Sequence, residues 1–273
     1  MDLPILAFTL FLVYSLQYPT DVKSVSDDDY RTVVDSEQFN FIAFIGSKQY
    51  VPLKKSKYHI TCLGVVITKK HVLSVYQCMK DTEKHKGKAE IFAGSREIYK
   101  CESYAIDRII TYNYWVEQNS RIPVFDYQNA VIIKVTREFD EKKIMPVFVP
   151  KRKDEFYGTP VTSVRFSARI RGLTATSELQ VTNLKLMSKN SCATKLTEPS
   201  DADGILFCSM SPPKMTGKDS GSPILYEKNT LAGINIAVAQ GYSKYRQENL
   251  HLNFKFLRDF VESQIGGELL LVK

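Results

Sequence analysis

The chain has 273 residues, of which 44% are apolar, and this composition is sufficient for a full hydrophobic core. It therefore excludes a disordered chain, and the length corresponds to one large or two small domains. The formal net charge is +7, but the sequence carries no recognised nucleic-acid-binding motif, so we expect no nucleic-acid partner. The four histidines are scattered and form no metal-ligand cluster with other residues, so we expect neither a metal nor a cofactor.

Residues 3–16 are almost wholly apolar and lie at the very N-terminus. A helix needs about 20 residues to cross a bilayer, so this run is too short and we expect no membrane span. Its position is typical of a secretory signal peptide, and a buried N-terminal strand is the alternative. We therefore predict a signal peptide at 1–16, a short leader or propeptide at 17–31, and a secreted, extracellular protein.

Five cysteines are consistent with secretion into an oxidising compartment, where cysteines pair. Cys62 and Cys78 have the same separation as Cys192 and Cys208, which predicts the disulfides Cys62–Cys78 and Cys192–Cys208. In the chain-entropy model each bridge stabilises the fold by about 3 kcal/mol. Cys101 is left over, either as a small buried hydrophobe or as the donor of an intermolecular bridge.

Short β-rich runs follow one another along almost the whole chain, with turn signals between them. They lie at 39–45, 62–67, 71–75, 89–92, 104–110, 130–135, 161–170, 179–187, 205–208, 224–226, 231–239 and 250–254. This pattern favours an all-β sandwich or barrel. Helical spacing is confined to about 256–265, and a basic, proline-flanked stretch at 146–153 is the predicted linker between two halves.

Residues Gly217 to Pro223 read Gly-Lys-Asp-Ser-Gly-Ser-Pro, and such turn-forming residues usually make a surface turn. An Asp-Ser-Gly-x-Pro turn also holds the nucleophile of trypsin-like serine proteases. The chain resembles this family over nearly its whole mature length. Cys62 to Cys78 resembles the family's Cys-Gly-Gly-x-Leu-Ile through Ala-Ala-His-Cys, and Asn129 to Val135 resembles its Asp-Ile-Ala-Leu-Leu-Lys-Leu.

The resemblance implies an all-β fold of two six-stranded antiparallel β-barrels followed by a C-terminal α-helix. The peptidase domain would occupy 32–273, with the first barrel at about 32–145 and the second at about 154–255. The helix would follow at about 256–265.

The family uses a histidine, an aspartate and a serine for catalysis, and the matching positions hold Gln77, Asn129 and Ser220. A glutamine amide does not titrate near neutral pH and cannot act as general base. Asn129 has no negative charge with which to stabilise an imidazolium. Loss of the histidine alone costs about a million-fold in turnover, or roughly 8 kcal/mol of barrier. We therefore expect an inactive homologue; the alternative is a weak serine hydrolase in which Ser220 has a non-standard base.

The substrate pocket also departs from the family pattern. Lys218 replaces a glycine whose backbone N–H faces the substrate oxygen, and a side chain there resists unusual backbone angles. Lys214 matches the pocket floor, although a one-residue slip in the match is an alternative. Ile236 and Val238 match the family's strand that pairs with substrate, where Val238 in place of glycine should narrow the pocket entrance.

Family zymogens are cut before Ile-Val-Gly-Gly, and the new amine pairs with the aspartate before the serine, which is Asp219 here. The nearest match is Arg31-Thr32-Val33-Val34, which lacks the two glycines. The resemblance allows cleavage after Arg31 without requiring it.

Two lysine-rich loops flank the first cysteine pair and would lie at the rim of the family's cleft. They predict a basic patch for an acidic protein surface or a sulfated glycan, and two ordinary solvated loops are the alternative. We expect the main partner to be an extracellular protein, such as an active protease or its substrate, in an immune, clotting or reproductive secretion. The lysines of the predicted patch are Lys54, Lys55, Lys57, Lys84, Lys86 and Lys88.

Overall fold

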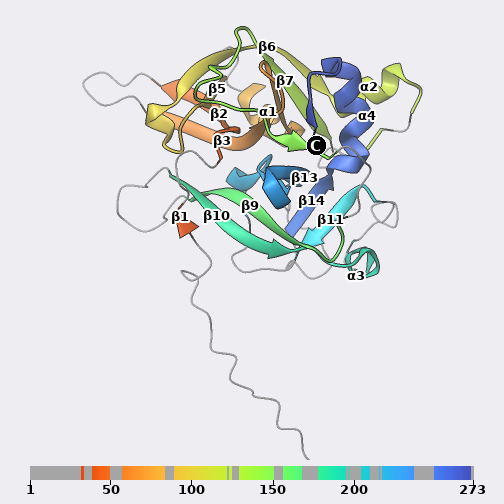
Figure 1. Cartoon of the computed structure of the whole chain (residues 1–273). Coiled ribbons are helices and arrows are strands. Elements are labelled where there is room, and N and C mark those ends of the chain that lie inside the picture. Colours follow the sequence, from red (N-terminus) through yellow and green to blue (C-terminus); the bar gives the residue numbers. More distant parts are fainter. Residues whose placement is uncertain are drawn as a thin grey trace, which may run out of the picture.

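Two β-sheets, one above the other in Figure 1, make up most of the computed structural model. The structure describes residues 32–33, 39–49, 57–83, 89–121, 123–124, 129–150, 156–167, 178–194, 196, 204–209, 215, 217–236 and 249–271. The predicted signal peptide and leader lie outside these residues. Residues 146–150 of the predicted linker are described, and 151–153 are not.

The upper sheet is a closed barrel of six antiparallel strands in the order β2-β3-β4-β7-β6-β5. Apolar side chains such as Phe44, Leu63, Phe92 and Ile132 are at most 1% exposed and fill the barrel. The strands are β2 (Ile42–Gln49), β3 (Lys57–Val66), β4 (His71–Val75), β5 (Glu90–Ala93), β6 (Glu102–Thr111) and β7 (Ala130–Val135).

The lower sheet runs β1-β10-β9-β12-β13-β14-β11, with antiparallel pairing throughout this path. A bridge between Leu186 and Ser209 brings the end of β10 to β11, so the six strands from β10 to β11 curl back on themselves. The all-β, two-barrel prediction is therefore confirmed. The strands are β1 (Thr32–Val33), β9 (Pro160–Ser167), β10 (Glu178–Lys185), β11 (Leu206–Ser209), β12 (Pro223–Tyr226), β13 (Thr230–Ile236) and β14 (Asn249–Asn253). Short strand β8 (Phe148–Val149) pairs in parallel with β13, and short strand β15 (Leu270–Leu271) pairs in parallel with β8.

The C-terminal helix α4 (Phe254–Ile265) is present and begins two residues before the predicted start. The Asn253 side chain caps it by accepting a hydrogen bond from the Lys255 N–H at 2.9 Å. Gly266 ends it in the left-handed conformation, with φ of 63°. None of the helices within the described ranges is long and apolar enough to cross a membrane.

Three further short helices were not predicted: α1 (Tyr76–Glu83), α2 (Tyr112–Gln118) and α3 (Lys189–Ala193). Side-chain caps start two of them, because Thr111 accepts from Tyr114 N–H and Ser188 accepts from Ser191 N–H. The 3₁₀ turns are η1 (Ile98–Lys100), η4 (Gly217–Asp219) and η5 (Glu227–Asn229). Such short helices carry too few periodic residues to stand out in a β-rich sequence.

Helix α2 packs against α4, and the two lie side by side in Figure 1. The Tyr112 ring lies 4.9 Å from that of Phe256 and 5.6 Å from that of Phe260. Trp115 contacts Phe260 as well, at 5.7 Å, and the Arg121 guanidinium lies 4.7 Å above the Trp115 ring. Aromatic packing therefore fixes the position of the chain just after β6.

Both predicted disulfides are present: Cys62–Cys78 joins β3 to α1, and Cys192–Cys208 joins α3 to β11. Cys101 is free and partly buried, and its Sγ donates to the Ser95 carbonyl at 3.2 Å. Burial raises the pKa of the Cys101 thiol to about 12, so it stays protonated and unreactive at neutral pH.

Candidate functional site

The turn that carries Ser220 lies where the two barrels meet. The Ser220 carbonyl accepts a hydrogen bond from the Leu63 N–H of β3 at 2.9 Å, and the Gly221 N–H donates to the Asn235 carbonyl of β13 at 2.8 Å. One turn therefore ties the upper barrel to the lower one. Ser220 itself is only 2% exposed.

Gly221 is required by this close approach. Its φ is 77°, and a Cβ atom here would lie 2.1 Å from the Leu63 carbonyl oxygen and 2.2 Å from Ser74 Oγ. Those two atoms are themselves hydrogen-bonded, because Ser74 Oγ donates to Leu63 O at 2.8 Å. Any larger residue would push the serine turn away from the first barrel.

The structure brings the three expected triad positions to this junction. Gln77 is the second residue of α1 and precedes Cys78, whose Sγ lies 3.8 Å from the Ser220 carbonyl oxygen. Asn129 stands just before β7, and its carbonyl accepts from the Tyr76 N–H at 2.7 Å. This bond continues the β4–β7 pairing by one step, so the residue before Gln77 lies beside Asn129.

The side chain of Asn129 is engaged in a structural bond. Its Oδ1 accepts from the Asn113 N–H of α2 at 3.1 Å, and Asn129 is only 3% exposed. Asn113 in turn holds Val124, donating from Nδ2 to its carbonyl at 2.9 Å and accepting from its N–H at 3.0 Å. Asn129, which matches the family's aspartate, thus helps to hold the segment that follows β6 in place. Sequence analysis missed Asn113, because nothing in a lone asparagine marks a partner 16 residues away.

The backbone at Ser220 forms a closed turn. The Ser220 N–H donates to the Gly217 carbonyl at 3.2 Å, and the Ser222 N–H donates to the Asp219 carbonyl at 3.1 Å. Lys218 lies in this 3₁₀ turn and is exposed. Acyl transfer needs backbone N–H groups directed at the substrate oxygen, whereas here the Ser220 N–H is directed at its own chain.

Asp219 is fully buried and forms an ion pair with Arg165 of β9. Arg165 Nη2 lies 3.1 Å from Asp219 Oδ2, and the two side chains are 12% and 1% exposed. The Asp219 carbonyl also accepts from Asn235 Nδ2 at 3.0 Å. Arg165 within the β-rich run 161–170 was the available signal, but the sequence does not show which acid it meets.

The histidines with described contacts have partners away from the serine turn. His71 Nδ1 lies 2.7 Å from Thr68 Oγ1, and His251 Nε2 lies 2.9 Å from Ser209 Oγ. Burial lowers the pKa of both, that of His251 to about 3, so both are neutral at physiological pH. His59 lies on β3 four residues before Leu63, roughly 13 Å along the strand. His85 lies outside the described residues.

The remaining predicted positions fall into two groups. Ile236 ends β13, pairs with Leu250 and is 2% exposed. Lys57 begins β3 opposite Gln49. The others lie outside the described residues: Lys54, Lys55, Lys84, Lys86, Lys88, Lys214 and Val238.

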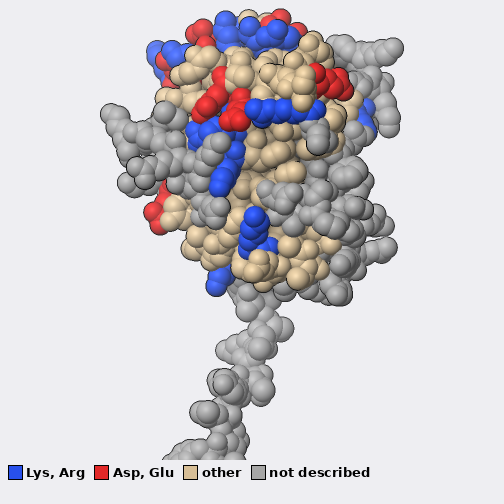
Figure 2. Space-filling model, turned by 90° about the vertical axis from the view of Figure 1, so that its right-hand side faces the viewer, with Lys and Arg blue, Asp and Glu red and all other residues tan. Residues whose placement is uncertain are grey.

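Charges of both signs are interspersed on the described surface. Figure 2 shows lysine and arginine side chains beside aspartate and glutamate side chains over the upper barrel. Arg137 and Lys143 both pair with Glu102, and Arg121 lies 3.5 Å from Asp259. Such exposed pairs contribute little to stability. The described parts of the chain hold no group of three or more His, Cys, Asp or Glu that could bind a metal.

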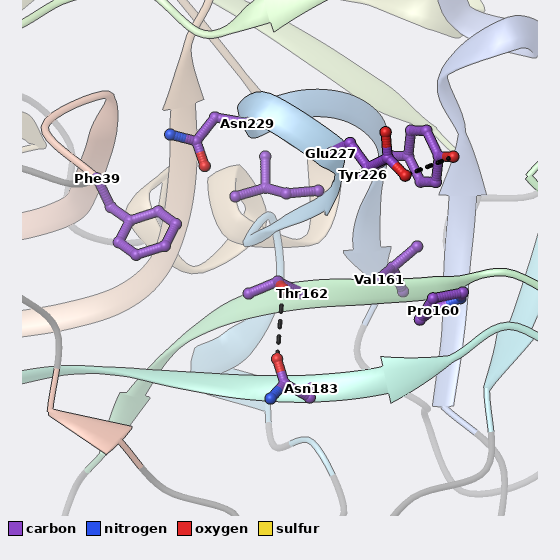
Figure 3. Close-up of a pocket in the computed structure, with 9 residues that line it drawn as sticks. Phe39, Pro160, Val161, Thr162, Asn183, Tyr226, Glu227 and Asn229 are labelled. Carbon is purple, nitrogen blue, oxygen red and sulfur yellow. Dashed lines mark hydrogen bonds between the residues drawn. The ribbon is translucent and has the colours of Figure 1, made fainter.

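A shallow hollow of about 300 Å³ lies on the second barrel, beside β9, β10 and β12. Phe39 lines one side, and Thr162 and Asn183 line another, with Thr162 Oγ1 3.4 Å from Asn183 Oδ1 (Figure 3). Tyr226 donates to Glu227 Oε1 at 3.1 Å beside it. Its lining includes none of the three triad positions, so it is a separate feature.

Two antiparallel barrels with a serine-bearing turn between them define the chymotrypsin-like class of serine protease folds. A family model described as Trypsin matches residues 36–255, so the chain belongs to the trypsin family. Among curated proteins none matches this sequence.

Solved structures support the same fold. The HL collagenase structure is 18% identical with a TM-score of 0.64, covering 87% of this chain and 97% of the collagenase chain. The scabies mite inactivated protease paralogue S-D1 is 18% identical with a TM-score of 0.63, covering 88% of this chain and 98% of its own. The paralogue S-I1 is 16% identical with a TM-score of 0.65, covering 86% and 98%.

Proposed function

We propose that this protein is a secreted, non-catalytic member of the trypsin family that acts as a binding partner, cofactor or regulator in an extracellular proteolytic pathway. The observation that carries the proposal is the state of the acid position: Asn129 is an amide, and its oxygen accepts from the Asn113 N–H. With Gln77 at the base position, these two matching positions supply neither a proton acceptor nor a carboxylate to orient one.

Two further features support the loss of catalysis. The Ser220 N–H, which would stabilise an oxyanion, donates to the Gly217 carbonyl at 3.2 Å. Ser220 is also 2% exposed, so a substrate carbonyl has little access to it. Two solved structures of this fold are described as inactivated protease paralogues, so an inactive protein on this scaffold has precedent.

Secretion is supported by the two disulfides, which form and persist in oxidising compartments. The apolar run at 3–16 supports it from the sequence side.

A fluorophosphonate probe tests the catalytic part of the proposal. The purified protein should show no more labelling than its Ser220→Ala variant, while an active trypsin-like protease labels fully in the same assay. Labelling that depends on Ser220 would instead identify a serine hydrolase with a non-standard base and would overturn the proposal.

A harsher test restores the triad by Gln77→His with Asn129→Asp. We expect little peptidase activity, because the Ser220 N–H remains in its turn and Lys218 remains beside it. Substantial activity in this double variant would show that the oxyanion turn and pocket are still competent.

Affinity capture from the secretion that contains the protein would identify its protein partner. Binding to a sulfated glycan is tested separately, through the predicted basic patch. On a heparin column, a variant with Lys54, Lys55, Lys84 and Lys86 changed to Ala should elute at lower salt than the wild type. A matched control changes four lysines elsewhere: Lys69, Lys100, Lys142 and Lys189. Equal loss in both variants would show only a general charge effect and would remove the sulfated glycan from the proposal.

A further inference from the structure

The buried carboxylate of Asp219 has a counter-ion from within the folded chain. Arg165 extends from β9, and its Nη2 lies 3.1 Å from Asp219 Oδ2. A carboxylate with a 1% exposed side chain is out of water, and a buried charge is tolerated when it is paired and hydrogen-bonded. Arg165 supplies this pairing in the full-length chain, without cleavage after Arg31.

The competing cation would be a new amino terminus at Thr32, released by cleavage after Arg31. In the structure Thr32 is already paired with Val181 of β10, and Val181 is paired with Val164 of β9. Neighbouring strands lie about 4.8 Å apart, so Thr32 lies two strands, or roughly 10 Å, from β9 in the plane of the sheet. The amine of Thr32 would therefore start at the edge of the sheet, with β10 between it and the strand that carries Arg165.

Arg165 already occupies the Asp219 carboxylate. Arg165 pairs with Gln180 of β10, and Gln180 pairs with Val33 of β1. Any incoming amine would have to displace an ion pair that is already formed.

We propose that Arg165 is a built-in counter-ion that fixes the turn Gly217–Ser222 in the uncleaved chain, so that proteolysis is not needed to complete this site. The pair holds the Asp219 side chain inward, while the Asp219 carbonyl accepts from Asn235 Nδ2 and the Ser222 N–H. The turn is thus anchored at the side chain and the backbone of one residue. The inference goes beyond the proposed function, because it holds whether or not Ser220 reacts.

Hydrogen exchange and thermal unfolding of the full chain test this role. Arg165→Met removes the charge and keeps a long side chain, and we expect exchange at Gly217–Ser222 to accelerate by roughly a hundredfold. Adding Asp219→Asn removes the orphaned carboxylate and should restore much of the protection and of the Tm. Arg165→Lys should fall between the wild type and Arg165→Met. Arg137→Met, at an exposed ion pair, is the matched control and should leave the turn unchanged.

The outcomes separate the alternatives even if Arg165→Met does not fold. A double variant that is no more stable or protected than Arg165→Met would overturn the proposal, since the effect would then not come from pairing the carboxylate. A lysine variant no better than the methionine variant would do the same. A chain that begins at Thr32 should show the same protection as the full chain. Greater protection of its Gly217–Ser222 turn would show that the new amine does complete the site.

Discussion

Replacing Asn129 by alanine tests whether the acid position has become a structural brace. The change removes the acceptor of the Asn113 N–H, which lies 3.1 Å from Asn129 Oδ1 at a residue that is 3% exposed. A buried donor left without an acceptor costs about 1–3 kcal/mol. For a domain of this size, each kcal/mol lowers the Tm by about 2–4 °C, so we expect a fall of about 2–12 °C.

Asn129→Asp separates the hydrogen bond from the side-chain volume, because a carboxylate oxygen can still accept from the Asn113 N–H. Hydrogen exchange should therefore be fast at the Asn113 amide in Asn129→Ala and slow in Asn129→Asp. Asn119→Ala is the control, since Asn119 is exposed and its side chain bonds to the Trp115 carbonyl rather than to Asn113. If Asn113 exchanges at the wild-type rate in Asn129→Ala, the brace does not exist in solution.

Three other predictions follow from burial and close contact. Gly221→Ala should abolish soluble folded protein, because its Cβ would lie 2.1 Å from Leu63 O, whereas Gly217→Ala, with no atom within 4 Å, should express normally. His251 has a folded pKa of about 3 against about 6.5 in the unfolded chain, so the unfolded state binds more protons between these values. The contribution of His251 to the free energy of unfolding should thus be fully present above pH 6.5. It should decline toward pH 3, by up to about 1.4 kcal/mol per pH unit. In urea titrations at different pH values, His251→Gln should lose stability less steeply than the wild type. The Cys101 thiol, with a pKa raised to about 12, should react with iodoacetamide at pH 8 far more slowly in the native protein than in urea; equal rates would contradict its burial.

The two-barrel architecture was predictable because the turn residues, the β-rich runs and the cysteine separations all indicated the same fold. The cysteine pairs stand at matching separations, and the residues Gly217 to Pro223 read as a turn in any fold. Alternating apolar runs then placed the strands of both barrels close to where they occur. The helices α1, α2 and α3 were missed, because five to eight residues show no helical period amid β-rich sequence.

The contacts that decide the chemistry were not predictable, because they join residues far apart in the chain. Arg165 meets Asp219 across 54 residues, and Asn113 meets Asn129 across 16 residues. Identity at Gln77 and Asn129 could suggest lost catalysis. Only the folded backbone reveals that the Ser220 N–H is already bonded to the Gly217 carbonyl.

The bond from the Leu63 N–H to the Ser220 carbonyl gives the serine turn a structural role that does not depend on catalysis. The turn links the two barrels through backbone hydrogen bonds, and these bonds form whatever side chain residue 220 carries. Gly221 is required for this contact whatever the reactivity of Ser220, because a Cβ there would meet the Leu63 carbonyl oxygen. A serine turn in this fold is therefore evidence of how the barrels are joined, and it does not by itself indicate peptidase activity.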